Sequence, residues 1–346
     1  MPINPVQGNL RDCVIVGGGP AGLSAGIYLA RVGLNPLLVE RDSLGGHARL
    51  IEKVENYPGF LNGISGAALM KRFAAQAGRW KLRTLKAEVV KAERRRGHFL
   101  FETTAGTLRA KAAIFSTGAA FKRLGVPGEE KFSGRGVYHA AFKHAKEFEG
   151  KTVAVAGGGD AAVLEALLLA RSAAKVYLIH RGSNWAAHGL LQKKLKTAKK
   201  IHPIFNTVIR RVLGDQTLKS IEIESVGNGG RTGPRRSFLD VDGLIVLIGK
   251  KPDFGLVQEV NKHPGVFLAG DVRLGRFRQV AIAAGDGVRA AMQCADYLNQ
   301  KKEVQRSPRA ELALLNYAKV IEQLRPRRHC EAPRGPRQSH REQSPS

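Results

Sequence analysis

Three glycines near the N-terminus have the spacing of a loop that binds a dinucleotide. Gly17, Gly19 and Gly22 follow the short apolar run Cys13–Val16 and open an alanine-rich stretch. In such a loop the first glycine permits a tight turn, the second lets a pyrophosphate approach the backbone, and the third lets helix and strand pack closely. The N-terminus of the following helix attracts the phosphates. The next apolar run ends in Glu40, where an acid would bind ribose hydroxyls.

Three glycines alone are weak evidence, because a glycine-rich turn in another α/β unit has the same pattern. Here strand, turn, helix, second strand and acid follow one another between residues 12 and 40. We therefore predict a dinucleotide site, and its residues are Gly17, Gly19, Pro20, Ala21, Gly22 and Glu40.

A second loop of the same kind follows residue 150. Gly157 and Gly159 come after the apolar run Thr152–Ala156, and Ala162 replaces the third glycine. A helix over 161–172 would follow. Two such loops in one chain are much more specific than one, and they predict two dinucleotides. The residues expected at the second site are Gly157, Gly159, Asp160, Ala161, Ala162, His180 and Arg181.

The second unit ends in His180 and Arg181 rather than in an acid. Arginine suits a ribose 2′-phosphate, whereas an acid suits a 2′-hydroxyl. The second site therefore favours NADPH over NADH. A single arginine followed by Gly182 would bind a 2′-phosphate with few contacts. The alternative interpretation is that His180 and Arg181 form the solvated end of a strand.

The three cysteines are Cys13, Cys294 and Cys330, and the chain has no Cys-x-x-Cys. They are too few and too scattered for a disulfide framework or a zinc site, so no metal is expected. Two histidines, His139 and His144, precede the second loop, and an imidazole can supply a proton near neutral pH. Surface histidines in a linker are the competing interpretation.

The chain of 346 residues carries a net charge of +27. A nucleic-acid surface, an acidic protein partner or a basic background would each explain this charge. The basic residues are spread along the whole chain and do not alternate with aromatic residues, so nucleic acid is the weakest of the three.

No apolar run approaches the roughly 20 residues of a membrane span. The first residues also lack the basic and then apolar order of a signal peptide. A cytoplasmic protein with no membrane segment is therefore expected.

The alternation of short apolar strands with helices predicts an α/β fold of two Rossmann-like, three-layer domains. The second, nucleotide-binding domain would be inserted into the first. Further helices are expected over 66–78 and from 278 to about 298, and hairpin strands over 87–91 and 98–103 with a turn at 94–97. The expected division is 1–120 and 250–300 for the first domain, 121–249 for the second, and 301–346 for a basic, largely disordered tail.

These pieces, in this order, resemble the low-molecular-weight thioredoxin reductase family over roughly residues 12–298. The resemblance rests on many stretches in one order. They are Gly17–Gly22, Gly45-Gly46, Val54–Gly59, Ser116–Ala119, Gly134–Val137, Gly157–Ala162, Gly270-Asp271 and Arg278–Val280.

The resemblance implies that FAD binds at the first loop, that NADPH binds at the second, and that the protein is a homodimer. It places Glu40 on the FAD ribose, Asp271 on the ribityl or phosphate region, and Asn56 beside the isoalloxazine. The remaining FAD residues that it implies are Gly46, His47, Val89, Thr117, Gly118, Arg278, Gln279 and Val280.

One departure from the family concerns the redox-active cysteine pair. The resemblance places that pair at Ala140 and Lys143, and its following acid at His144. A thiolate is the nucleophile in thiol–disulfide exchange, and neither alanine nor lysine replaces it. The connection over 249–264 is also shorter than is usual in the family.

A related group, the thioredoxin-reductase-like ferredoxin–NADP reductases, has the flavin but no cysteine pair. The segment Lys146–Lys151 and the loop Gly157–Asp160 are similar to that group, whereas Val54–Phe60 and Arg278–Ala284 are more similar to thioredoxin reductase itself.

We therefore expect an NAD(P)H-dependent flavoprotein oxidoreductase that passes electrons to an acidic carrier such as ferredoxin or flavodoxin, with His144 as a candidate proton donor. Two alternatives stay open. One is a thioredoxin reductase that uses an atypical thiol, and the other is a flavin-bound regulatory protein without turnover.

Overall fold

The computed structural model describes residues 10–226, 235–273, 275 and 277–306. By its internal contacts the chain divides into two units, residues 1–298 and 299–346. In the second unit, the described residues form the last part of one long helix.

The first dinucleotide loop belongs to a seven-stranded sheet within the described residues. Its strands are β1 (Arg11–Val16), β2 (Pro36–Glu40), β3 (Arg83–Lys86), β4 (Val89–Arg95), β5 (His98–Thr103), β6 (Gly106–Phe115) and β17 (Val266–Leu268). Strand β1 pairs in parallel with both β2 and β6, and β17 pairs in parallel with the end of β6. The carboxyl ends of β1, β6 and β17 therefore meet at one edge, where ligands bind in such sheets.

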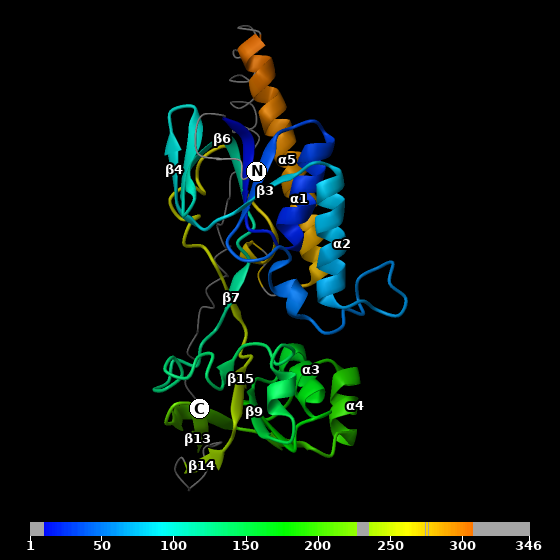
Figure 1. The fold of residues 1–346 in the computed structure, drawn as a ribbon, viewed down its shortest axis with the longest axis vertical. Coiled ribbons are helices and arrows are strands. Elements are labelled where there is room, and N and C mark those ends of the chain that lie inside the picture. The colour runs from blue at the N-terminus through cyan, green and yellow to red at the C-terminus, as the bar shows by residue number, and fades with distance from the viewer. Residues whose placement is uncertain (1–9, 227–234, 274, 276, 307–346) are drawn as a thin grey trace, which may run out of the picture. The chain divides into compact units, whose positions relative to one another are not determined.

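Helices cover one face of this sheet (Figure 1). They are α1 (Pro20–Arg31), α2 (Gly66–Arg79) and α5 (Val280–Arg306). The buried side chains of α1 and α5 pack with those of β1 and β6 in one apolar cluster. A second cluster on the opposite face includes Phe99 and Phe101 of β5 together with Val257 and Val260. The sheet is thus buried on both faces, as parallel sheets usually are.

The second loop belongs to a five-stranded sheet in the order β11-β10-β9-β15-β8. These strands are β8 (Val137–Tyr138), β9 (Thr152–Ala156), β10 (Lys175–Ile179), β11 (Ile201–Ile204) and β15 (Gly243–Val246), and all their pairings are parallel. Helices α3 (Asp160–Leu169) and α4 (Gly189–Thr197) accompany them. Their apolar side chains pack with β9 and β10 in one cluster.

Two smaller sheets and three single turns of 3-10 helix complete the described fold. The antiparallel strands β12 (Thr207–Gly214), β13 (Leu218–Ser225) and β14 (Arg236–Asp240) form one sheet, and β7 (Ala119–Phe121) pairs with β16 (Lys250–Pro252) in the other. The turns are η1 (Gly46–Leu50), η2 (Ala145–Phe148) and η3 (Gly270–Val272).

The α/β fold expected from the sequence is confirmed, while three element boundaries differ. The helix expected over 161–172 ends at Leu169, because the chain turns there to start β10 at Lys175. Strand β4 extends to Arg95, since Arg95 pairs with His98 and leaves only two residues in the turn. Helix α5 continues to Arg306.

Residues 301–306, at the start of the basic tail expected over 301–346, belong to helix α5. This stretch contains no glycine or proline to end the helix. The rest of that tail lies outside the described residues.

Candidate functional site

The first glycine loop has one open position between two closely packed ones. Gly17 has φ +101°, and a Cβ there would lie 2.4 Å from the carbonyl oxygen of Ser116. A Cβ on Gly22 would lie 1.9 Å from the carbonyl oxygen of Gly17. Around Gly19, by contrast, a Cβ would meet no atom within 4 Å. The loop is therefore packed against the protein on both sides and bare where a pyrophosphate would approach.

Glu40 is held beside this loop by the backbone. Its Oε2 accepts a hydrogen bond from the N–H of Gly18 at 2.6 Å, and its Oε1 accepts one from the N–H of Asp42 at 2.9 Å. The two contacts fix the carboxylate at the end of β2, next to the turn that follows β1. Pro20, Ala21 and Gly22 form the first turn of α1, whose N–H groups point toward the loop.

The second glycine pair of the sequence folds back onto the first loop. The N–H of Gly45 donates to the carbonyl oxygen of Gly18 at 2.7 Å, and a Cβ on Gly46 would lie 3.4 Å from the Cα of Gly19. His47 follows, and its ring centroid lies 4.7 Å from that of Phe121. Burial, together with the nearby charge of Lys250, lowers the pKa of His47 to about 4. His47 is therefore neutral at pH 7.

Asn56 and Gln279 meet although 223 residues separate them. The amide Nδ2 of Asn56 donates to Oε1 of Gln279 at 3.0 Å. Val280 begins α5 and is buried in a cluster with Ala48 and Val54. A hollow of about 600 Å³ is lined by Glu55, Asn56, Tyr57, Pro58, Gly59, Phe60 and Leu61. Residues proposed for the isoalloxazine therefore adjoin an open space.

Three further residues expected at the FAD site make contacts with the short β16 segment or the loop after it. The hydroxyl of Thr117 donates to the carbonyl oxygen of Asp253 at 2.9 Å, and the N–H of Asp253 donates to the carbonyl oxygen of Gly118 at 3.2 Å. Nη1 of Arg278 donates to the carbonyl oxygen of Lys250 at 3.2 Å.

The charged groups around this segment titrate abnormally. Burial raises the pKa of Asp271, against the opposing effect of Lys250 and Arg278. Burial also lowers the pKa of Lys250. The Nε atom of Arg278 is buried without a hydrogen-bond partner. A bound polar group would satisfy it, so the residues present fit a cofactor such as FAD.

Val89 lies elsewhere. Its side chain is buried with Val14, Leu37 and Phe101 in the apolar cluster on the sheet face opposite helices α1 and α5. The structure thus places the side chain of Val89 in the apolar core of the sheet.

The second glycine loop repeats the design of the first. Gly157 has φ +146°, and a Cβ there would lie 2.4 Å from the carbonyl oxygen of Leu247. Ala162 is fully buried at the third position, and a Cβ on Gly159 would meet no atom within 4 Å. Again the middle glycine alone is open.

The ring of His180 packs against this second loop. A Cβ on Gly158 would lie 2.4 Å from Nδ1 of His180, so the ring lies directly against the loop. The ring also stacks on Trp185 with a centroid distance of 5.7 Å. Burial lowers the pKa of His180, which favours the neutral imidazole. Arg181 is exposed, as a residue that meets a phosphate from solvent would be.

Asp160 begins helix α3 and pairs with His188. Its Oδ1 accepts from the N–H of His188 at 2.8 Å, and its Oδ2 lies 2.7 Å from His188 Nε2. The N–H groups of Ala186 and Ala187 donate to the carbonyl oxygen of Gly158. The stretch from Trp185 to His188 therefore lines the second loop, which the sequence did not predict. Its only sequence signal was an aromatic residue shortly after Arg181.

The segment Tyr138–Phe148 contains the positions where the family has its cysteine pair. The rings of Tyr138 and His144 stack at 3.8 Å, and Nδ1 of His144 lies 2.9 Å from Oε1 of Glu147. Tyr138 donates to the same carboxylate at 3.4 Å. These contacts fix the orientation of the His144 ring.

Three other contacts hold this segment. The ring of His139 stacks on Phe121 at 5.2 Å, with its Nδ1 2.9 Å from the carbonyl oxygen of Val246. Glu165 of α3 accepts from the N–H of Ala141 at 2.8 Å. The sequence did not predict Glu165 or Lys250, because neither belongs to a short motif.

Cys13 and Cys294 are both free and fully buried. Their side chains contact each other between β1 and α5, and burial together with this contact raises the pKa of Cys13 well above its usual range. A buried thiol with a raised pKa is a poor nucleophile. Cys330 lies outside the described residues.

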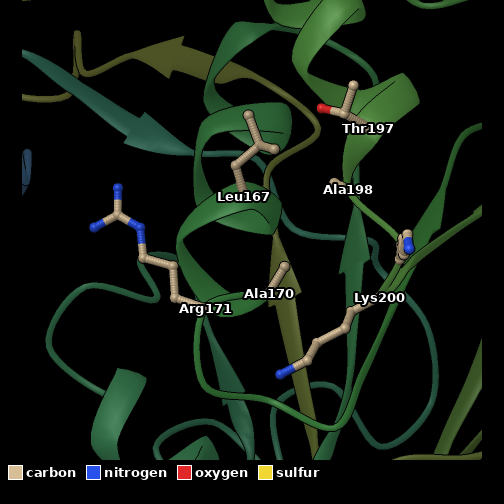
Figure 2. A pocket seen from close by; sticks show the side chains of 7 residues that line it. Leu167, Ala170, Arg171, Thr197, Ala198 and Lys200 are labelled. Atoms are coloured by element: carbon tan, nitrogen blue, oxygen red, sulfur yellow. The ribbon is translucent and has the colours of Figure 1, made fainter.

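A separate hollow of about 320 Å³ lies at the C-terminal end of α3 (Figure 2). Its lining residues are Leu167, Ala170, Arg171, Thr197, Ala198, Lys199 and Lys200. The second glycine loop precedes the other end of the same helix, at Asp160. This hollow is therefore distinct from the expected nucleotide site.

No helix in the described part of the chain is both long enough and apolar enough to cross a membrane.

Comparison with known proteins gives consistent matches along most of the chain. The family model described as pyridine nucleotide-disulphide oxidoreductase matches residues 11–287. Thioredoxin reductase of Treponema pallidum is 35% identical over 303 residues, covering 83% of this chain and 97% of that protein. Thioredoxin reductase of Streptomyces coelicolor is 35% identical over 309 residues, covering 84% of this chain and 94% of that protein.

Solved structures give a similar result. The crystal structure of Lactococcus lactis thioredoxin reductase, in its FR conformation, matches with a TM-score of 0.79 at 30% identity, covering 84% of this chain and 99% of that one. The thioredoxin reductase of T. acidophilum matches with a TM-score of 0.76 at 28% identity, covering 84% and 98%.

Proposed function

Because the chain belongs to the thioredoxin reductase family of pyridine nucleotide-disulphide oxidoreductases, we propose that it passes electrons from NAD(P)H through FAD to an external acceptor without a cysteine pair of its own. As a member of that family it is an NAD(P)H-dependent flavoprotein oxidoreductase, with FAD and NADPH as the cofactors of the family. The proposal concerns the path of the electrons after the flavin.

The observation that carries the proposal is the composition of the segment at Ala140–Lys143. An alanine methyl group and a lysine ammonium group cannot form or break a disulfide. The two described thiols, Cys13 and Cys294, are fully buried and contact each other. Within the described residues no thiol is therefore exposed to a protein substrate.

In our proposal the first loop binds FAD and the second binds NAD(P)H. When bound, FAD would supply the chemistry that accepts a hydride and releases electrons singly. The bare backbone at Gly19 would receive the FAD pyrophosphate, and Glu40 would hold the ribose. Asp271, Arg278 and Gln279 would contact the rest of the cofactor.

His144 is the proposed proton donor. Its Nδ1 is engaged by Glu147 and its ring is stacked on Tyr138. An imidazole that is held through one nitrogen can exchange a proton through the other. A surface histidine that stabilises the segment is the simpler role, and replacement of His144 by Gln separates the two by its effect on the pH profile.

The acceptor that we propose is a small acidic electron carrier such as ferredoxin or flavodoxin. A net charge of +27 would speed its association through salt-dependent steering. Thioredoxin is the second candidate, and the names of the relatives favour it. Such a reaction would need Cys330, which lies outside the described residues, or direct transfer to the thioredoxin disulfide.

Stopped-flow measurements test this proposal. The enzyme is reduced anaerobically with NADPH, or with NADH in parallel, and then mixed with ferredoxin, flavodoxin or oxidised thioredoxin. We expect fast reoxidation by an acidic carrier, slowed by salt. Fast turnover with thioredoxin alone, lost in a variant with all three cysteines replaced by alanine, would establish the second candidate instead. A flavin that neither nucleotide bleaches would favour the regulatory interpretation.

We also propose a homodimer, a cytoplasmic location and the four-part division of the chain at residues 120, 249 and 300. The family relationship supports the first of these. The sheets support the third, because the strands β8 to β15 lie between residues 137 and 246. Analytical ultracentrifugation of the purified protein tests the dimer.

A further inference from the structure

Asp286 is a buried carboxylate that the proposed chemistry does not use. It lies in α5 and its side chain is 4% exposed. Oδ2 accepts from the N–H of Gly270 at 2.8 Å. Oδ1 accepts from Nη2 of Arg273 at 2.6 Å and from Nε of Arg289 at 2.8 Å. Nε of Arg273 lies 3.2 Å from Oδ1 and 3.1 Å from Oδ2.

These contacts keep the carboxylate ionised. Burial alone would raise the pKa of Asp286, but the donors of Arg273 and Arg289 and the N–H of Gly270 outweigh it and lower the pKa. A buried charge that is fully hydrogen-bonded is a rigid attachment point, since no other arrangement would satisfy it as well.

The atom that Asp286 holds belongs to a tight turn. Gly270 has φ +76°, and a Cβ there would lie 2.8 Å from the Cβ of Ala21. Gly287, which follows Asp286, approaches the same place, because a Cβ on it would lie 2.1 Å from the carbonyl oxygen of Ala21. Both the turn and α5 therefore close on the first turn of α1, directly after the glycine loop.

Arg289 extends the attachment to the strand before the turn. Its Nη2 donates to the carbonyl oxygen of Leu268 at 3.2 Å, at the end of β17. Asp286 thus binds the backbone at Gly270, and Arg289 binds it at Leu268. The next residue, Asp271, is the one proposed to contact FAD.

From this geometry we propose that Asp286 is a positioning residue for FAD, which fixes the turn at Gly270 and Asp271 against the N-terminus of α1. Asp286 does not touch the cofactor. It sets the distance between two parts of the proposed FAD site, the bare backbone at Gly19 and the carboxylate of Asp271. The inference rests on the proposed FAD site, but not on the identity of the electron acceptor.

A purely structural role for Asp286 predicts a different result from a positioning role. If Asp286 has a purely structural role, its replacement speeds FAD release only as much as the loss of stability explains. If Asp286 has a positioning role, its replacement speeds FAD release by more than a comparably destabilising substitution elsewhere in the same helix. Leu298 provides that comparison, because it is 2% exposed, packs in the core and lies in α5 several helical turns beyond Asp286.

The experiment measures FAD release from the purified holoenzyme, by the rise of flavin fluorescence after dilution, and the thermal midpoint of each variant. The variants are Asp286→Asn and Leu298→Ala, with Asp296→Asn as an exposed control on the same helix. We expect release from Asp286→Asn to be at least tenfold faster than from wild type. Release from the other two should stay within threefold, although Leu298→Ala lowers the midpoint.

Asp286→Asn leaves two guanidinium groups without their counter-charge and could fail to fold. The double variant Asp286→Asn with Arg273→Gln removes one of these cations and keeps the charge balance. Wild-type FAD release from either folded variant would overturn the proposal, as would equal acceleration by Leu298→Ala at an equal midpoint. If the wild-type protein itself holds no FAD, the proposed function fails instead.

Discussion

The backbone N–H of Ala141 donates to Oε2 of Glu165 across a distance of 2.8 Å. The backbone of Phe142 contributes a second hydrogen bond to the same carboxylate. Glu165 belongs to α3, the helix that follows the second glycine loop. The segment at the family's cysteine positions is therefore shaped by an acid from the proposed nucleotide-binding helix, and no disulfide is needed to hold it.

Replacement of Glu165 by Gln tests this attachment through pH. Burial raises the pKa of Glu165, so the folded state binds its proton more tightly than the unfolded state. The stability contributed by this group is therefore greatest in acid and falls as the pH rises through the raised pKa. Relative to the variant, the wild-type protein should lose free energy of unfolding between about pH 4 and neutrality. Urea denaturation of both proteins measures the difference, and a relative gain of the wild type would contradict the assignment.

Two substitutions in the first glycine loop should have opposite effects. Gly19→Val adds atoms to open space, so the protein should fold normally and lack visible flavin absorbance. Gly17→Ala places a Cβ against the carbonyl oxygen of Ser116 at a positive φ and should cost about 2 kcal/mol or more of stability. Thermal melting and the flavin content of the purified proteins separate the two. A Gly19→Val protein with full flavin would disprove the proposed pyrophosphate position.

Restoring the cysteine pair should create thioredoxin reduction. The variant Ala140→Cys with Lys143→Cys is expected to gain two thiols that titrate after reduction by NADPH, and to reduce thioredoxin faster than the wild type. The single variant Ala140→Cys is the control, because one thiol cannot form the internal disulfide. If the wild-type protein reduces thioredoxin as fast as the double variant, electron transfer does not depend on this segment.

His47 should make the protein less stable in acid. Its pKa of about 4 lies below the ordinary value of 6.5, so the unfolded state takes up a proton before the folded state does. Its unfavourable contribution therefore grows as the pH falls from 6.5 toward 4. Relative to His47→Gln, the wild type should lose stability between neutrality and about pH 4, by an amount that solvent screening reduces because His47 is exposed in part. Denaturation curves of both proteins at several pH values check this, and equal losses in the two proteins would show that the surroundings of His47 do not disfavour its charged form.

The short motifs could be interpreted from the sequence because each is local. Glycines in one turn, an apolar strand before it and an alanine-rich helix after it act on their own neighbours, and these features predicted both loops and the α/β fold. The ends of β4, α3 and α5 were less well predicted, because element boundaries depend on how the chain packs afterwards. The absence of the cysteine pair was also evident from the sequence, because the residue types at Ala140 and Lys143 are known without a structure.

Other parts of the proposed site exist only in the folded chain. Asn56 meets Gln279 across 223 residues, and Asp286 reaches Gly270 from the facing helix. Such pairs form because parallel strands bring their ends to one edge and α5 packs back over β1, and no spacing in the sequence records that approach. The unusual protonation of His47 and Glu165 has the same origin, because burial and neighbouring charge are properties of the packed structure. The sequence by itself determined which dinucleotide loops are present, while only tertiary packing decided which charged side chains surround them.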